Sequence, residues 1–188
     1  MSDLIPLTAL GGTSPRVDTF QGLEISECPE WALASIAARS GRATDMASAA
    51  QAFLGVALPD VARTAEKAPF SVFWMGPEQW MIEAPHDSHE DLATQIKAAL
   101  GDTASVTEQT DGWVRFDLTG ERCHDVLERL CNADSRSMPP GSATRTQLEH
   151  LGCFLIRRPQ DSHFSVLGPR SSAGSLHHAL ETAAKSAI

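Results

Sequence analysis

The chain has 188 residues, of which 42% are hydrophobic and 21% are charged, and its formal net charge is −9. This length allows one large domain or two small lobes that share a core, and the composition is typical of a globular protein. The acidic balance excludes most nucleic-acid-binding proteins, because contacts to phosphates need clustered Lys and Arg side chains.

The segment Met1–Leu10 has neither the basic nor the long apolar part of a signal peptide. No stretch approaches the ~20 apolar residues of a membrane-spanning helix. The four cysteines contain no C-x-x-C pair, and two of them lie eight residues apart on one expected helix, which predicts reduced thiols. We therefore expect a cytoplasmic protein. The cysteines are Cys28, Cys123, Cys131 and Cys153.

Residues 1–30 are interrupted by proline and glycine and predict an extended N-terminal arm. The arm either folds onto its own domain or docks onto another subunit, and the first is the commoner behaviour of a chain terminus. Residues 31–188 predict a single globular domain of two lobes, 31–110 and 111–188.

The first lobe predicts the order β-α-β-β-α-β, which is that of a ferredoxin-like fold. Its two helices are expected to begin at the N-caps Thr44 and Ser88 and to end at Gly55 and Gly101. Asp87, Glu90 and Asp91 are then expected in the first turn of the second helix, where the helix dipole favours acidic side chains. The expected strands are 31–38, 70–75, 80–84 and 104–109.

The second lobe begins with a strand over 113–118, in which Val114, Phe116 and Leu118 alternate with Arg115 and Asp117. This period of two predicts a strand with one buried face and one charged face. An amphipathic helix follows and is expected to end at Asn132. Further strands are expected over 144–149, 153–157 and 164–167, and Ser172 is the expected N-cap of a last helix.

The sequences of the two lobes match at positions that lie a constant 84 residues apart, which predicts an internal repeat. Matches fall on strand positions, on a proline, on a predicted N-cap and on helix core positions, where the fold constrains the residue type. The sequence therefore predicts an α+β protein of two pseudo-repeated ferredoxin-like lobes. The pairs are Phe70 with Phe154, Val72 with Ile156, Trp80 with Phe164, Ile82 with Val166, Pro85 with Pro169, Ser88 with Ser172, Leu92 with Leu176, Ile96 with Leu180 and Ala99 with Ala183.

The histidines and cysteines do not form a recognisable catalytic or metal-binding pattern. His86 and His89 lack a third ligand nearby, and the neighbours His177 and His178 diverge on a helix. Cys123 is expected in the core and His124 on the surface.

Trp74 and Trp80 flank a hairpin turn and are expected to pack there, although an exposed recognition patch is the alternative. Gly11-Gly12 does not open a phosphate-binding helix, and no G-x-G-x-x-G or G-x-S-x-G motif occurs. The sequence thus predicts no catalytic, cofactor-binding or metal-binding residue in this chain.

Four stretches nevertheless resemble the gamma subunit of heterotetrameric sarcosine oxidase, over about residues 70–184. They are Gly76-Pro77-Glu78-Gln79-Trp80-Met81, Thr119–Leu127, Pro140–Thr146 and Arg170–Leu176. The resemblance implies the folate-binding-domain fold of the glycine cleavage aminomethyltransferase.

The resemblance also implies a structural subunit that carries no catalytic residue and assembles with alpha, beta and delta subunits. That complex oxidatively demethylates sarcosine to glycine, with hydrogen peroxide and a one-carbon unit passed to tetrahydrofolate. The resemblance places FAD, FMN, NAD, zinc and tetrahydrofolate in the partner subunits.

Two alternatives stay open. One is a free-standing folate-binding protein of this fold, and the other is a homo-oligomeric module whose arm pairs with itself. The charged face of the helix after Gly120 and the loop 135–140 are the expected contacts with a partner.

Overall fold

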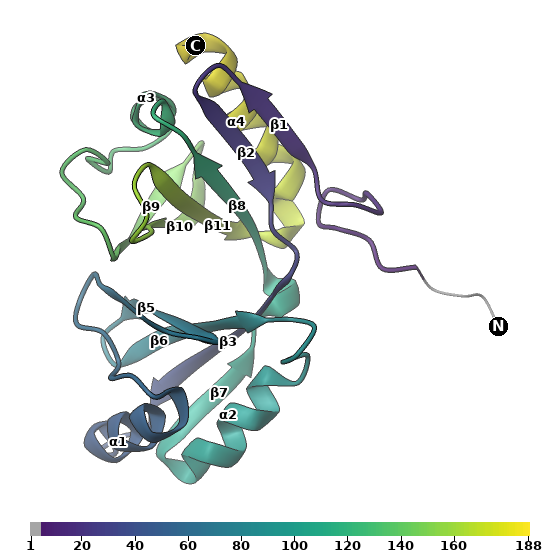
Figure 1. The fold of residues 1–188 in the computed structure, drawn as a ribbon. Helices are drawn as coiled ribbons and strands as arrows, with labels where there is room; N and C mark the ends of the chain where they lie inside the picture. The colour runs from purple at the N-terminus through teal and green to yellow at the C-terminus, as the bar shows by residue number, and fades with distance from the viewer. Residues whose placement is uncertain (1–4) are drawn as a thin grey trace. The chain divides into compact units, whose positions relative to one another are not determined.

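The computed structural model describes residues 5–188, and the chain divides into two compact units. Unit 1 comprises the N-terminal segment up to Pro29, Gly112–Pro140 and Arg145–Ile188, and unit 2 comprises Glu30–Asp111 and Gly141–Thr144. Each unit is an antiparallel sheet with two α-helices packed on one face (Figure 1). Residues 5–188 therefore form a mixed α/β structure of two sheets and four α-helices.

Unit 2 carries a five-stranded sheet in the order β4-β5-β6-β3-β7. The hairpin β5–β6 lies beside β3, and β3 separates it from β7, so both edges of the sheet are short strands. The elements are β3 (Trp31–Ala38), α1 (Ala43–Leu54), β4 (Thr64–Lys67), β5 (Phe70–Gly76), β6 (Gln79–Pro85), α2 (Leu92–Leu100) and β7 (Ala104–Glu108).

The core of unit 2 follows from the period of two along these strands. Alternate residues such as Ala34, Ile36 and Ile82 turn to the helices and are fully buried against Met46 of α1 and Ile96 of α2. Helix α1 ends where Gly55 adopts the left-handed conformation (φ 73°), as the sequence predicts.

Unit 1 carries a six-stranded sheet in the order β1-β2-β8-β11-β10-β9. The N-terminal hairpin β1–β2 thus joins strands that lie about a hundred residues later in the sequence, and β2 pairs with β8. The elements are β1 (Val17–Phe20), β2 (Leu23–Glu27), β8 (Trp113–Thr119), α3 (Cys123–Leu130), β9 (Ser142–Leu148), β10 (Leu151–Arg157), β11 (His163–Pro169) and α4 (Ala173–Ala187).

The core of unit 1 lies between its sheet and the helices α3 and α4. Phe116 of β8 and Phe164 of β11 are fully buried there, together with Val126 of α3 and Leu176 and Leu180 of α4. Burial of side chains of this size contributes about 1.5–3 kcal/mol each, so this cluster dominates the stability of the unit.

The turn of the β1–β2 hairpin packs closely against the start of α3. Gly120 has φ +120°, and a Cβ atom at this position would lie 2.3 Å from the carbonyl oxygen of Gly22. The same oxygen accepts a hydrogen bond from the backbone N–H of Arg122 at 3.1 Å. Glycine is required at residue 120 because any side chain would collide with the hairpin.

The structure corrects the prediction of an extended arm over residues 1–30. Residues 17–27 form the β1–β2 hairpin of unit 1 instead. The predicted boundary between the lobes, residues 110 and 111, lies within a residue of the observed change of unit after Asp111, but the predicted first lobe, 31–110, omitted Gly141–Thr144. The prediction erred because β1 and β2 are short and because β2 pairs with β8, a strand remote in sequence.

Three predicted helix ends are wrong. The N-cap of α1 is Arg42, two residues before the predicted Thr44. Helix α2 begins at Leu92, after the predicted N-cap Ser88. Asp91 is the N-cap of α2, so Asp87 and Glu90 precede the helix. Helix α3 ends at Leu130 rather than at Asn132, because Cys131 adopts an extended conformation. Ser172 is the N-cap of α4, as predicted, without a side-chain hydrogen bond.

The proposed matches between β5 and β10 are out of register by one residue. In the ladders, Val72 lies opposite Ile82, whereas Leu155, not Ile156, lies opposite Val166. Phe70 consequently packs on the helix side of its sheet, and Phe154 lies on the other side of its own.

No helix within residues 5–188 is long and apolar enough to cross a membrane.

Candidate functional site

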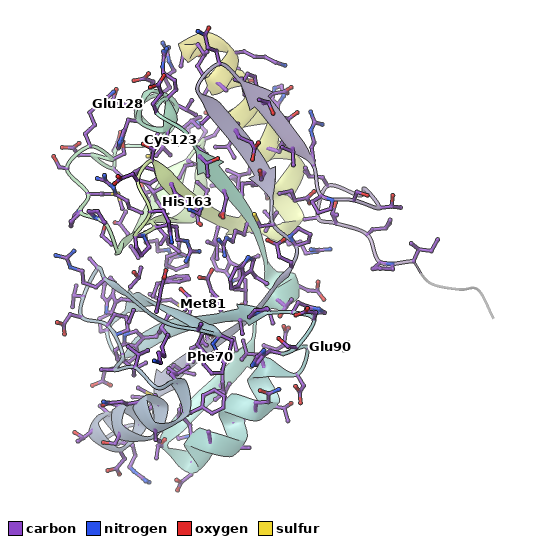
Figure 2. All side chains as sticks on the ribbon, in the orientation of Figure 1. Phe70, Met81, Glu90, Cys123, Glu128 and His163 are labelled. Atoms are coloured by element: carbon purple, nitrogen blue, oxygen red, sulfur yellow. The ribbon has the colours of Figure 1, made fainter. Side chains whose placement is uncertain are left out.

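The most concentrated chemistry of the chain is a buried polar group on the sheet of unit 1, here called the Asp117 cluster. It consists of Arg115 and Asp117 on β8, His163 and Ser165 on β11, and Arg158 directly after β10. These residues alternate with the core residues of their strands and therefore face away from the helices. Figure 2 labels His163 on this part of the sheet. All but His163 are buried, and Ser165 has no exposed surface.

The carboxylate of Asp117 is the centre of the cluster. Arg115 donates two parallel hydrogen bonds to it, from Nε at 2.8 Å and from Nη2 at 2.7 Å. The hydroxyl of Ser165 donates at 2.6 Å, and His163 Nε2 lies 2.9 Å from Oδ2. Arg158 Nε donates to Ser165 Oγ at 2.7 Å and so extends the chain of hydrogen bonds to β10.

These contacts determine the charge state of the cluster. Burial by itself would raise the pKa of Asp117, but the hydrogen bonds from His163, Arg115 and Ser165 and the charge of Arg115 outweigh burial and hold that pKa well below its usual range. Asp117 is therefore an anion at any physiological pH. A bidentate guanidinium–carboxylate pair is among the stronger polar contacts in proteins.

The Asp117 cluster is arranged to hold strands together rather than to transfer protons. A general acid or base needs a pKa near the working pH and a free position for the substrate. The pKa of Asp117 is far from neutrality, and both of its oxygens accept hydrogen bonds from the chain itself. The cluster joins β8, β11 and the end of β10 and fixes their register, since a slip of one residue would turn these side chains into the core.

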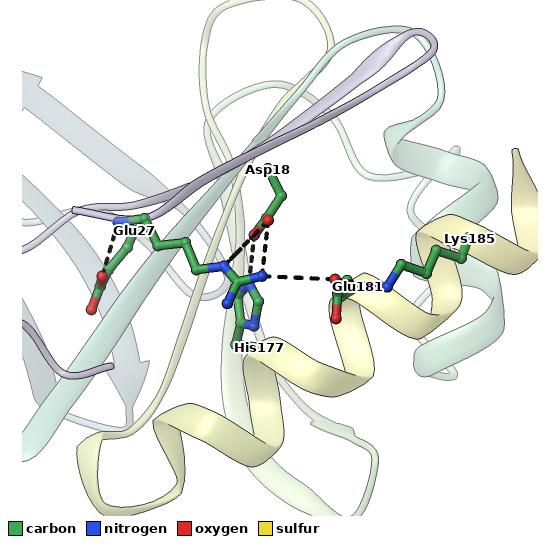
Figure 3. A network of polar contacts seen from close by, with 6 residues as sticks. Asp18, Glu27, His177, Glu181 and Lys185 are labelled. Carbon is green, nitrogen blue, oxygen red and sulfur yellow. Dashed lines mark hydrogen bonds and ion pairs between the residues drawn. The ribbon is translucent and has the colours of Figure 1, made fainter. Parts of the chain in front are cut away.

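A second polar network ties the N-terminal hairpin to helix α4 (Figure 3). Asp18 of β1 accepts hydrogen bonds from Arg16 Nε at 2.9 Å, and His177 Nε2 lies 2.7 Å from its Oδ2. Glu181 lies 3.7 Å from Arg16 and 2.8 Å from Lys185. The hydrogen bond from Arg16, and the contact with His177 after it, lower the pKa of Asp18.

The carboxylate of Glu27 holds the segment that precedes this hairpin. Oε1 accepts from the backbone N–H of Leu10 at 3.0 Å, and Oε2 accepts from that of Arg16 at 3.1 Å. Glu27 is only 4% exposed, so its charge is compensated mainly by these two backbone donors. Figure 3 shows the side chain of Glu27 beside the Asp18 network.

A third network orders the loop after α3. His124 Nδ1 lies 3.0 Å from the hydroxyl of the buried Ser135, and Arg136 bridges Asp125 at 2.7 Å and Glu128 at 2.5 Å. Arg157 donates to the carbonyl oxygen of Met138. Partial burial, followed by the charges of Arg136 and Arg157, lowers the pKa of His124, which favours its neutral form. His124 is thus half-buried and packed, not on the surface as predicted.

Three of the four thiols, those of Cys123, Cys131 and Cys153, are not activated. Burial raises the pKa of Cys123 to about 12 and that of Cys153 to about 11, and burial also raises the pKa of Cys131. A nucleophilic cysteine needs the opposite shift. None of the four cysteines forms a disulfide, and Cys123 lies in the core on α3 (Figure 2), as predicted.

The remaining candidates from the sequence lie in separate places. His86 and His89 follow β6, where the ring of His89 stands edge-on to Phe70 at 5.3 Å. His177 is buried against Phe116, and its neighbour His178 is exposed. Trp80 packs beside Trp74 and donates to the carbonyl oxygen of Pro59 at 2.9 Å. Within residues 5–188, no three His, Cys, Asp or Glu side chains converge on a possible metal position.

The sequence missed the Asp117 cluster, although its alternation was visible. The charged face of β8 was expected to meet water, as it does in most antiparallel sheets with one polar face. In the structure Arg115 and Asp117 are buried instead. The signal that could have revealed this lies in other strands, because Ser165 and His163 complete the cluster from a segment some fifty residues later.

No model of a known protein family matches this chain, and a search of curated proteins by sequence finds no relative. Solved structures do match. The chain shares its fold with a chain of the heterotetrameric sarcosine oxidase from Corynebacterium sp. U-96, crystallised with pyrrole 2-carboxylate. The TM-score is 0.77 at 22% identity, and the match covers 90% of this chain and 87% of that chain.

A second match is the glycine cleavage system aminomethyltransferase T from Bartonella henselae, with a TM-score of 0.64 at 13% identity. It covers 82% of this chain but only 44% of that enzyme. The resemblance read from the sequence is thereby confirmed at the level of the fold. The chain has the fold that is found in a chain of heterotetrameric sarcosine oxidase and in part of aminomethyltransferase T.

Proposed function

We propose that this chain is a non-catalytic structural subunit, of the gamma type, in a heterotetrameric sarcosine oxidase. The observation that supports this most is the match in fold along nearly the whole length of both chains, at 90% and 87%. The proposed partners are the alpha, beta and delta subunits. These partners would hold FAD, FMN, NAD, zinc and tetrahydrofolate and would oxidatively demethylate sarcosine to glycine.

The chemistry of the described residues supports a structural role. Asp117 is engaged with Arg115, His163 and Ser165, and its pKa lies far from the range of a proton-transfer group. Cys123 and Cys153 have raised pKa values, which keep both thiols protonated. The titratable groups that lie closest together thus stabilise the sheet and do not provide a reactive centre.

We also propose that the two units arose by duplication of one ferredoxin-like unit. The strand order β5-β6-β3-β7 of unit 2 corresponds to β10-β11-β8-β2 of unit 1, with a helix after β3 and β8 and another after β6 and β11. Strands β6 and β11 keep the offset of 84 residues from end to end. In unit 1 the last strand of the pattern, β2, comes from the N-terminal segment.

The proposal is tested with the purified chain and with the assembled complex. We expect the chain alone to be colourless and to produce no hydrogen peroxide from sarcosine. We expect the same chain, co-expressed with its three companion subunits, to purify in a flavin-containing complex that oxidises sarcosine. Oxidation of sarcosine by the chain alone would contradict a non-catalytic role.

A free-standing folate-binding protein is the second candidate, and the fold shared with aminomethyltransferase T favours it. Unit 1 offers one carboxylate with two guanidinium groups on one sheet face, at Asp117, Arg115 and Arg158. A pterin would have to displace hydrogen bonds that Asp117 already accepts. Fluorescence titration of the purified chain with tetrahydrofolate distinguishes the candidates, since saturable binding supports this one and its absence removes it.

A further inference from the structure

The loop that follows helix α3, residues 131–140, is here called the α3 loop. It contains no helix or strand, yet side chains hold it in one position. Arg136 forms ion pairs with two acidic side chains of α3, at 2.7 and 2.5 Å, and Arg157 at the end of β10 donates to the carbonyl oxygen of Met138. Met138 also packs against the core of unit 1. The α3 loop is thus fastened both to α3 and to β10.

The inner contact of the α3 loop joins Ser135 to His124, the second residue of α3. Nδ1 of His124 lies 3.0 Å from the hydroxyl oxygen of Ser135, which has no exposed surface. The His124 ring stands edge-on to Phe164, with 5.3 Å between the ring centroids. The guanidinium of Arg157 lies 5.8 Å from the centroid of the same phenyl ring. His124 is therefore a half-buried ring between the loop and the core.

The charged groups near this ring come from the α3 loop, from β10 and from α3 itself. Arg136 and Arg157 disfavour a positive charge on His124, whereas Glu128 and Asp125 favour it. Partial burial is the largest influence, and with the two guanidinium groups it outweighs the carboxylates and lowers the pKa of His124. The ring is therefore neutral at neutral pH, and it binds a proton less readily than a histidine in water.

The hydrogen bond to Ser135 is sensitive to that proton. A neutral imidazole has one nitrogen that donates and one that accepts, whereas both nitrogens donate in the protonated ring. In the tautomer with its proton on Nε2, Nδ1 of His124 accepts from the hydroxyl of Ser135. A proton on Nδ1 reverses this bond, so the hydroxyl proton of the fully buried Ser135 must leave its acceptor. A buried donor without an acceptor is unfavourable.

We propose that the contact between His124 and Ser135 is a pH-dependent switch, which opens the α3 loop when His124 binds a proton and leaves the sheet and helices of unit 1 folded. With the loop open, the ring meets water and has the ordinary histidine pKa of about 6.5. Because the pKa is lower with the loop closed, the closed form is fully favoured above about pH 6.5 and loses stability as the pH falls below that value.

The switch is a property of this chain alone. Where the α3 loop meets a partner subunit, as the sequence leads us to expect, opening of the loop would weaken that contact at acid pH. This consequence rests on the proposed function, whereas the switch itself does not.

Hydrogen exchange of the isolated chain measures the opening of the loop. The amides of Ser137 and Met138 donate to Asp134 in the closed loop. We expect their protection, corrected for the intrinsic effect of pH on exchange, to fall three- to tenfold between pH 7.5 and 5.5. About tenfold is the limit for one proton bound one pH unit below 6.5. Asp134 stays ionised over this range, because the hydrogen bond from the Ser137 hydroxyl lowers its pKa.

Two variants assign the effect to one histidine. His124→Gln keeps a polar side chain that cannot take up a proton, so the protection of the loop should be the same at both pH values. The matched control is His178→Gln, which replaces an exposed histidine of α4 and should keep the wild-type pH dependence. The amide of Phe116 on β8 should stay equally protected throughout, since the sheet remains folded.

Nuclear magnetic resonance of the imidazole nitrogens tests the direction of the hydrogen bond. At pH 8 we expect Nδ1 of His124 to carry no proton. A proton on Nδ1 at that pH, equal protection of the loop at pH 7.5 and 5.5, or a pH dependence that persists in His124→Gln overturns the switch. Loss of protection at Phe116 over the same range also overturns it. None of these outcomes bears on the subunit role, which the assembly experiment tests separately.

Discussion

At the scale of single residues, Asp117 is the position on which the sheet of unit 1 depends most. It compensates the buried guanidinium of Arg115 and accepts hydrogen bonds from Ser165, which has no exposed surface. Removing one partner of a buried ion pair leaves the other charge without compensation in a medium of low polarity. The ion pair Arg42–Asp45 is the natural comparison, since both of its side chains are exposed to water.

We expect Asp117→Asn to lower the free energy of unfolding by about 3 kcal/mol, because Arg115 then stays buried beside a neutral amide. Urea denaturation followed by circular dichroism measures this change. The control Asp45→Asn should leave the midpoint nearly unchanged, since exposed pairs contribute little. Equal, small effects of the two substitutions would show that the Asp117 cluster does not stabilise the sheet.

The pH dependence follows from the same residue. The pKa of Asp117 is lowered in the folded chain relative to the unfolded chain, so its contribution is complete above the unfolded value of about 4 and is lost as the pH falls below it. We expect the difference in unfolding free energy between wild type and Asp117→Asn to be constant from about pH 7 to 5 and to shrink below about 4. A difference that already shrinks between pH 7 and 5 would contradict the lowered pKa.

At the scale of elements, the contact between the β1–β2 turn and the start of α3 joins the N-terminal hairpin to the rest of unit 1. Gly120 combines φ +120° with a backbone contact that leaves no room for a Cβ atom. The carbonyl group of Gly22 is fixed there by Arg122, so the hairpin cannot move aside without breaking that hydrogen bond.

We expect Gly120→Ala to destabilise the chain by about 2 kcal/mol or more, from backbone strain together with displacement of the hairpin. The control is Gly152→Ala on β10, where φ is not positive and no atom lies within 4 Å of the added carbon. Thermal unfolding compares the two variants. If both melt at the temperature of the wild type, the close approach of the hairpin to α3 is not a constraint on the fold.

Most elements could be predicted from local patterns, and the exceptions have physical reasons. The strand over 113–118 was predictable from the alternation of its own side chains, and the end of α1 was predictable from Gly55, which adopts the left-handed conformation. Both signals lie within a single segment of the sequence. The hairpin β1–β2 was missed because its strands are short and it joins the sheet only through the pairing of β2 with β8, far away in the sequence. The starts of α1 and α2 were misplaced because neither helix carries a side-chain cap.

The candidate site was less predictable than the fold. Each half of the pair Arg115–Asp117 was visible on one strand, but burial of that face depends on the whole chain. The networks around Asp18 and Glu27 were hidden for the same reason, because they join the N-terminal segment to residues that are close only after folding. The ungapped offset of 84 residues aligns β6 correctly with β11 but places β5 one residue out of register with β10. An ungapped match between sequences can therefore misalign one strand although the next strand is aligned correctly.

At the scale of the whole molecule, one comparison and one chemical observation support the proposed role. The fold matches a chain of heterotetrameric sarcosine oxidase over 90% of this chain, and the closely placed titratable groups of unit 1 are engaged with one another. In the proposed role, the chain contributes surfaces to an assembly. The proposed surface is the ordered loop after α3, which Arg136 holds to Asp125 and Glu128.

Native mass spectrometry of the tagged chain, isolated at its natural level of expression, tests directly whether the chain is a subunit of a sarcosine oxidase. We expect one copy of this chain in a complex with three different subunits, with the visible absorbance of bound flavin and with oxidation of sarcosine. A colourless monomer of 20.2 kDa as the sole species would contradict it.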